Sequence, residues 1–94
     1  MHLNSDFKTA GKLAIERISE LYERERALVR MLIQGMPHKK IASRLCLSVR
    51  TIEQCKKHTL EKTGTRSSAQ LAAVAILSGE SEFLTAALDD SVET

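Results

Sequence analysis

The residues best suited to specific chemistry form a cluster of amides, carboxylates and cations between Ser48 and Gly64. Ser48 is a typical N-cap and Gly64 a typical C′ residue, so the two predict the limits of a helix, about residues 48–63. Ile52, Cys55 and Thr59 have the spacing of its inward stripe. The remaining side chains then reach outward: Arg50, Glu53, Gln54, Lys56, Lys57 and His58. Such a face is suited to reading base edges in the major groove of DNA.

A second, shorter helix is predicted immediately before this one. Pro37 fits the first turn of a helix, where its missing N–H is not needed. Ile41, Ala42 and Leu45 then give the apolar face of that helix. The period breaks at Leu45-Cys46-Leu47, so the segment from Met36 to Gly64 reads as a helix-turn-helix.

The N-terminal third is predicted to be helical from about Ser5 to Gln34, with Gly35 as its C′ residue. Residues at steps of three and four run through this segment, and all but Glu25 are apolar: Phe7, Ala10, Ala14, Ile18, Leu21, Glu25, Leu28 and Leu32. Ser19 could cap a second helix, or one long helix could continue through it. We favour an added N-terminal helix with a bend or continuation near Ser19.

Ser67 and Gln70 form a capping-box pattern that opens another helix, which is apolar almost all round. Its core face would hold Leu71, Val74, Ala75 and Ser78, and Gly79 would end it. A different face is then left uncovered, and we expect it to form a dimer interface: Ala72, Ala73 and Ile76. The N-terminal helix could instead supply the dimer contact or cover this face within one chain. Residues 81–88 predict a short amphipathic helix before an acidic end.

The charge is unevenly distributed although the net value is only +2. Residues 36–66 carry a net +6, whereas residues 67–94 contain five acids and no Lys or Arg. One face should therefore approach polyanions and another should not. A low aromatic content of 3% and 94 residues favour one domain of packed aliphatic helices.

Several function classes are disfavoured. The sequence has no apolar run of membrane length and no signal peptide, so a cytoplasmic protein with no membrane partner is expected. The two cysteines are expected to be free thiols. Cys55 and His58 could present two ligands to a metal, and Cys46 or Cys55 could be redox-active, but we expect no metal and no cofactor. No catalytic constellation is found, which argues against an enzyme.

The spacings resemble those of the LuxR-type (GerE/FixJ-like) helix-turn-helix over about Leu21 to Gly79. The residues that carry the resemblance are Leu21-Tyr22-Glu23-Arg24-Glu25, Gly35, Lys39, Ile41-Ala42, Leu45-Cys46-Leu47-Ser48, Thr51-Ile52-Glu53, Lys62 and Gly64-Thr65-Arg66. The sequence departs from the family pattern at Tyr22, Pro37, Lys40 and Cys55, where Thr, Ser, Glu and His are usual. The resemblance implies an all-α, four-helix domain at 21–79. To it are added an N-terminal helical extension at 1–20, a short C-terminal helical extension and an acidic tail within 80–94.

By the same resemblance, Glu53, Gln54 and Lys57 occupy positions that reach base edges, although Glu53 could instead orient Arg50 or Lys57. Lys39 begins the first helix of the motif, where it can hold a phosphate. Arg66 could form an internal ion pair with Glu25 instead of binding DNA. The remaining phosphate candidates are Lys40, Arg50, Thr51, Lys56, Lys62 and Arg66.

The implied function is a small transcriptional regulator that binds double-stranded DNA, as a homodimer, with its helix 48–63 in the major groove. About twenty residues precede Leu21, too few for a receiver or ligand-binding domain. The alternative is an interaction module that heterodimerises with and inhibits a full-length LuxR-type regulator, or contacts RNA polymerase. A domain excised from a longer protein is a further alternative, against which Met1 and the added tails argue.

Overall fold

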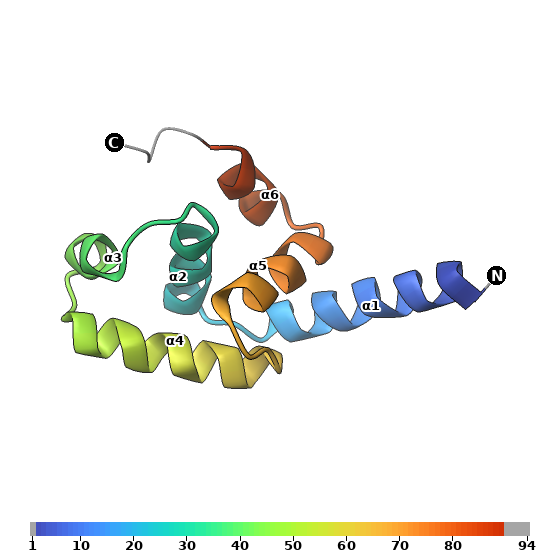
Figure 1. The fold of residues 1–94 in the computed structure, drawn as a ribbon, viewed down its shortest axis with the longest axis horizontal. Helices are drawn as coiled ribbons and strands as arrows, with labels where there is room; N and C mark the ends of the chain where they lie inside the picture. The colour runs from blue at the N-terminus through green and yellow to red at the C-terminus, as the bar shows by residue number, and fades with distance from the viewer. Residues whose placement is uncertain (1, 90–94) are drawn as a thin grey trace.

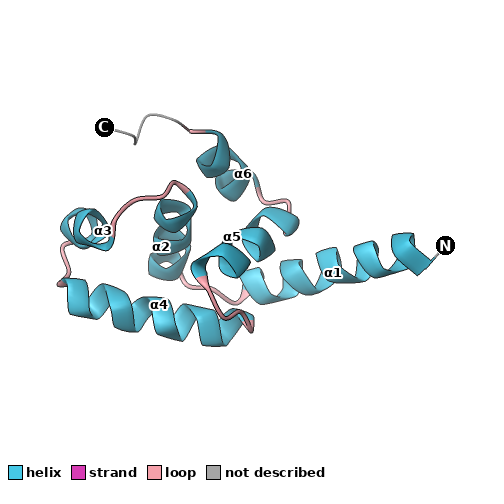
Figure 2. Ribbon diagram, in the orientation of Figure 1, coloured by secondary structure: helices cyan, strands magenta, loops and turns pink. Residues whose placement is uncertain are grey.

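A computed structural model describes the backbone of residues 2–89 and the side chains of residues 9–89. All regular secondary structure in residues 2–89 is helical (Figures 1 and 2). The helices are α1 (His2–Ser19), α2 (Glu23–Ile33), α3 (His38–Leu45), α4 (Val49–Thr63), α5 (Ser68–Leu77) and α6 (Ser81–Leu88). The predicted all-α fold is confirmed, and helices are present at both ends of the described chain, α1 and α6, as the sequence predicts. The side chain of Phe7 and the acidic residues beyond Asp89 lie outside the described part.

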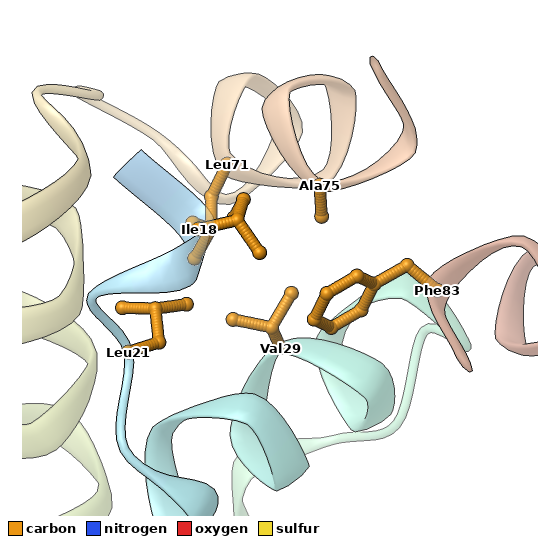
Figure 3. Packing of buried hydrophobic residues seen from close by; sticks show 6 residues of the cluster. All are labelled: Ile18, Leu21, Val29, Leu71, Ala75 and Phe83. Carbon is orange, nitrogen blue, oxygen red and sulfur yellow. The ribbon is translucent and has the colours of Figure 1, made fainter. Parts of the chain in front are cut away.

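Helix α2 packs on both sides, and this divides the core into two clusters. Leu28 belongs to one cluster, with buried residues of α3 and α4 such as Ile41 and Ile52. Its neighbour Val29 belongs to the other, and both residues have no exposed surface. Figure 3 shows this second cluster, which is built from α1, α2, α5 and α6 and the turn after α1: Ile18, Leu21, Val29, Leu71, Ala75 and Phe83.

The N-terminal segment forms two helices rather than one. Helix α1 ends at Ser19, and α2 begins after Tyr22, whose backbone is extended. Tyr22 makes no side-chain cap; instead its amide donates to Glu25 Oε1 at 2.8 Å. Pro37 also differs from expectation, because it is the N-cap of α3 and not part of its first turn. Its carbonyl accepts hydrogen bonds from the amides of Lys40 and Ile41.

The acidic segment that begins at Glu80 is bound to the body of the protein. The Arg26 guanidinium donates to both Glu80 and Glu82, and Arg30 also pairs with Glu82. Burial alone would raise the pKa of Glu82, but the hydrogen bonds from the two arginines outweigh it and lower that pKa. These ion pairs hold α6 against α2. Phe83, the residue after Glu82, is then buried in the second cluster.

The uncovered face of α5 is not the one expected. Ile76 is partly buried and packs against the second cluster, so the expectation that the core does not need it is wrong. Ala72 is half-buried and Ala73 is exposed. Leu77, one turn after Ala73, keeps 41% of its surface exposed. The exposed side of α5, which we call its free face, therefore runs through Ala73 and Leu77, and Leu77 borders a pocket that α1 also lines.

We predict that Phe83→Ala lowers the free energy of unfolding by about 3–5 kcal/mol, because a fully buried aromatic side chain leaves a cavity. Leu88→Ala is the matched control on the same helix, since Leu88 is 81% exposed and should change stability by less than about 0.5 kcal/mol. Chemical denaturation measures both. Equal, small effects would mean that α6 is not part of the folded core.

Candidate nucleic-acid interface

The turn between α3 and α4 is built by local hydrogen bonds. Cys46 adopts the left-handed conformation at φ 57°, and the Leu47 amide donates back to the Ala42 carbonyl at 2.9 Å. Ser48 then caps α4, because its hydroxyl accepts a hydrogen bond from the Thr51 amide. At the other end, Gly64 has φ 69°. Both predicted limits of this helix are confirmed, and the helix-turn-helix arrangement follows from them.

Helix α4 has a buried face and a solvent face. Ile52, Thr59 and Thr63 are fully buried, and Cys55 between them is partly buried. Exposed side chains recur every three or four residues on the opposite face: Arg50, Glu53, Gln54, Lys57, His58 and Glu61. We call this set the α4 outer stripe. At about 1.5 Å per residue it is about 16 Å long. In Figure 1, α4 lies along the lower edge of the molecule, and α6 lies on the opposite side.

All three residues predicted to reach base edges lie on this stripe. Glu53, Gln54 and Lys57 are exposed. Among the described residues no ion pair involves Glu53, so an orienting pair with Arg50 or Lys57 is not seen. The stripe presents amide, carboxylate and ammonium groups together, which are the groups that hydrogen-bond to adenine, cytosine and guanine edges.

The predicted phosphate contacts separate into exposed and engaged side chains. Lys39, Arg50 and Arg66 are exposed, whereas Lys40 and Lys56 are half-buried. The Thr51 hydroxyl lies 2.9 Å from that of Ser48 within the cap of α4. These exposed cations are therefore spread over the start of α3, the start of α4 and the turn between α4 and α5.

Lys62 is engaged inside the protein. Its ammonium lies 2.8 Å from Glu25 Oε1 and 3.9 Å from the centre of the Tyr22 ring. The alternative that Arg66 forms an ion pair with Glu25 is not seen: Glu25 pairs with Lys62, and Arg66 is exposed. The geometry therefore speaks against a phosphate contact by Lys62, which ties the end of α4 to the start of α2.

The Glu25 carboxylate is the centre of this contact. Its exposed fraction is only 7%, and it accepts from both the Tyr22 amide and the Lys62 ammonium. Burial by itself would raise the pKa of Glu25, but these hydrogen bonds outweigh it and hold the pKa below its ordinary value. The carboxylate thus stays charged and holds α2 and α4 together.

A groove of about 670 Å³ lies beside the stripe, between the start of α2 and the part of α4 from Thr51 to His58. Arg24 and His58 line it together with Gln54. From the sequence, no functional role was predicted for Arg24, and for His58 only an outward position and a possible role as a metal ligand. The signal for Arg24 was its place beside Glu25: when Glu25 and Leu28 turn inward, Arg24 must turn outward.

This region shows little sign of a reactive cysteine or of a metal site. Cys55 lines the groove, where burial raises the pKa of its thiol and so disfavours the reactive thiolate. Within the described residues, no three His, Cys, Asp or Glu side chains gather as metal ligands would. No helix in the described part of the chain is long and apolar enough to cross a membrane.

Comparison with known proteins agrees with this geometry. The chain is similar to the transcriptional regulatory protein UhpA of Salmonella typhimurium, with 41% identity over 63 residues. These residues make up 67% of this chain and 32% of that protein, so the chain spans about a third of the length of this curated relative. No solved structure matches. Residues 19–75, more than half of the chain, match the family described as bacterial regulatory proteins, luxR family. The chain belongs to this LuxR-type helix-turn-helix family.

Proposed function

We propose that this protein is a sequence-specific DNA-binding regulator of transcription that places α4 in the major groove. The observation that carries the proposal is the α4 outer stripe, a solvent-facing row of hydrogen-bonding side chains on a helix of a helix-turn-helix. A major groove about 12 Å wide admits one α-helix, and base pairs there present distinct donors and acceptors. Gln54 and Lys57 read base edges, and Glu53 accepts from a cytosine amino group.

Phosphate contacts flank this stripe. Lys39 in the first turn of α3 and Arg50 in the first turn of α4 are both exposed. At a helix start, free amide donors and the helix dipole add to the attraction of a cation for phosphate. Arg24 and His58 in the neighbouring groove extend the interface toward α2. The other phosphate candidates contribute less. Lys40 and Lys56 are partly buried, and the Thr51 hydroxyl is engaged in the cap of α4. Arg66 lies beyond the C-terminal end of α4, away from Lys39 and Arg50 in the sequence.

We further propose that the protein binds as a homodimer through the free face of α5. Helix α5 carries no charged residue, and the small exposed side chain of Ala73, with the half-buried Ala72 beside it, lets two helices approach closely. Because Ile76 is partly buried, Leu77 replaces it as the central apolar contact. A symmetric dimer of this kind matches an operator with two half-sites about one helical turn apart.

The first test concerns base reading. Gln54→Ala and Lys57→Ala should each cost about 1–3 kcal/mol on a duplex selected from random sequences, and much less on unrelated duplexes. Lys12→Ala is the control, since Lys12 is an exposed cation on α1 away from α4. Fluorescence anisotropy with both duplexes measures the effect. Equal losses on the two duplexes would show that Gln54 and Lys57 touch only the backbone.

The second test concerns the phosphate contact of Lys39. Lys39→Ala should weaken binding to all duplexes alike, and the slope of log K against log salt should fall by about one unit. The reason is that one fewer counterion is released on binding. Lys12→Ala should leave the slope unchanged. An unchanged slope for Lys39→Ala as well would place Lys39 away from the duplex.

The third test concerns the dimer. Leu77→Asp should yield monomers in analytical ultracentrifugation and weaken binding to a two-half-site duplex, because a carboxylate would be buried without a partner in each subunit. Leu84→Asp is the matched control: Leu84 is 39% exposed, close to the 41% of Leu77, but lies on α6. Circular dichroism checks that both variants fold. A Leu77→Asp variant that stays dimeric contradicts the α5 interface.

The selection experiment also separates this proposal from its alternative. An enriched palindrome supports a dimer that reads DNA. If no sequence is enriched and the protein binds DNA only weakly, the proposed function is wrong, and an interaction module that binds another regulator or RNA polymerase becomes the better explanation.

A further inference from the structure

The C-terminal end of α4 is in contact with a side chain from α1, which lies outside the segment that matches the family. Arg17 Nη1 donates a hydrogen bond to the Thr63 carbonyl at 2.9 Å, across 46 positions of the sequence. The last four carbonyls of a helix have no partner within the helix, and a cation at that end also interacts favourably with the helix dipole. Arg17 therefore caps the helix that carries the outer stripe.

The guanidinium of Arg17 lies close to the backbone of Gly64, although both residues are exposed to solvent. A Cβ atom at Gly64 would lie 2.6 Å from Arg17 Nη1 and 3.2 Å from its Cζ. The guanidinium thus lies against the bare backbone of Gly64. The Thr63 hydroxyl donates a hydrogen bond to the Thr59 carbonyl at 2.8 Å, and the Thr63 carbonyl accepts the hydrogen bond from Arg17.

Helix α1 is itself firmly placed, so Arg17 acts from a fixed position. The residue after it, Ile18, is fully buried in the second cluster. The Ile18 carbonyl accepts a hydrogen bond from Arg26 Nη2 at 3.1 Å. Arg26 in turn holds Glu80 and Glu82 of α6. A chain of contacts thus runs from α6 through α2 and α1 to the end of α4.

We propose that Arg17 is a positioning residue for DNA recognition, which acts on the α4 outer stripe without touching DNA. The bond to Thr63 fixes the end of α4 relative to α1, and so sets how Lys57 and His58, one to two turns earlier, enter the groove. Hydrogen bonds to base edges need side chains placed within about 0.5 Å, whereas backbone contacts tolerate more movement. This inference rests on the proposed DNA-binding function.

The experiment compares Arg17→Gln with Lys12→Gln, which removes the same charge from the same helix, and with Arg17→Lys, which keeps a cationic donor. Affinity for the selected and the unrelated duplex is measured over a range of salt concentrations. The temperature is one at which circular dichroism shows every variant folded. Arg17→Gln should weaken binding to the selected duplex about two- to fivefold, the effect of a cation at a helix C-terminus. Binding to the unrelated duplex and the salt slope should not change.

The controls and a second measurement make the result decisive. Lys12→Gln should behave as wild type, and Arg17→Lys should recover part of the affinity. Amide hydrogen exchange at Gly64 and Thr65 should be faster in Arg17→Gln only, because the last turn of α4 loses its cap. Equal weakening on both duplexes with a slope lower by about one unit would make Arg17 a phosphate contact instead. Unchanged affinity and exchange would overturn the proposal, whereas wild-type protein that binds neither duplex would refute the proposed function itself.

Discussion

The two-sided burial of α2 is the constraint on which the other helices depend. Leu28 and Val29 are adjacent in sequence and both fully buried, yet they belong to different clusters. Adjacent residues on a helix point about 100° apart, so α2 can be covered only by helices on two sides. The helix-turn-helix pair α3 and α4 takes one side, and α1, α5 and α6 take the other. The helices outside the motif are therefore part of what holds α2 in place.

The orientation of α4 follows from contacts at both of its halves. Ile52 anchors the first half in the cluster around Leu28. The second half is held by polar contacts, with Lys62 on Glu25 and the Thr63 carbonyl on Arg17. Since these groups all lie on the inner side or at the end of the helix, the outer stripe stays free. A recognition surface of this kind needs rigid support, because base edges are read by geometry as well as by charge.

The charge distribution also has a structural explanation. Glu80 and Glu82 pair with Arg26 and Arg30, so acids near the C-terminus offset cations of α2. Pairs that are partly exposed contribute only about 0.2–1 kcal/mol each, so Phe83 rather than these pairs accounts for most of the stability that α6 adds. Over the residues that the structure describes, the charged side chains of α3 and α4 that form no ion pair include more cations than carboxylates. The net charge of +2 therefore understates the attraction of this face for a polyanion.

The sequence by itself determined the helices, because their signals are local. Ser48 and Gly64 delimit α4, and Gly35 and Gly79 follow α2 and α5 with positive φ. The outward row on α4 follows from the same periodicity. Only the tertiary structure decided which distant groups meet: Glu25 with Lys62 rather than Arg66, Ile76 against the core, and Arg17 on Thr63. These pairings depend on the angles at which helices cross and on a few ångströms of side-chain reach, and neither quantity is encoded in the spacing along one helix.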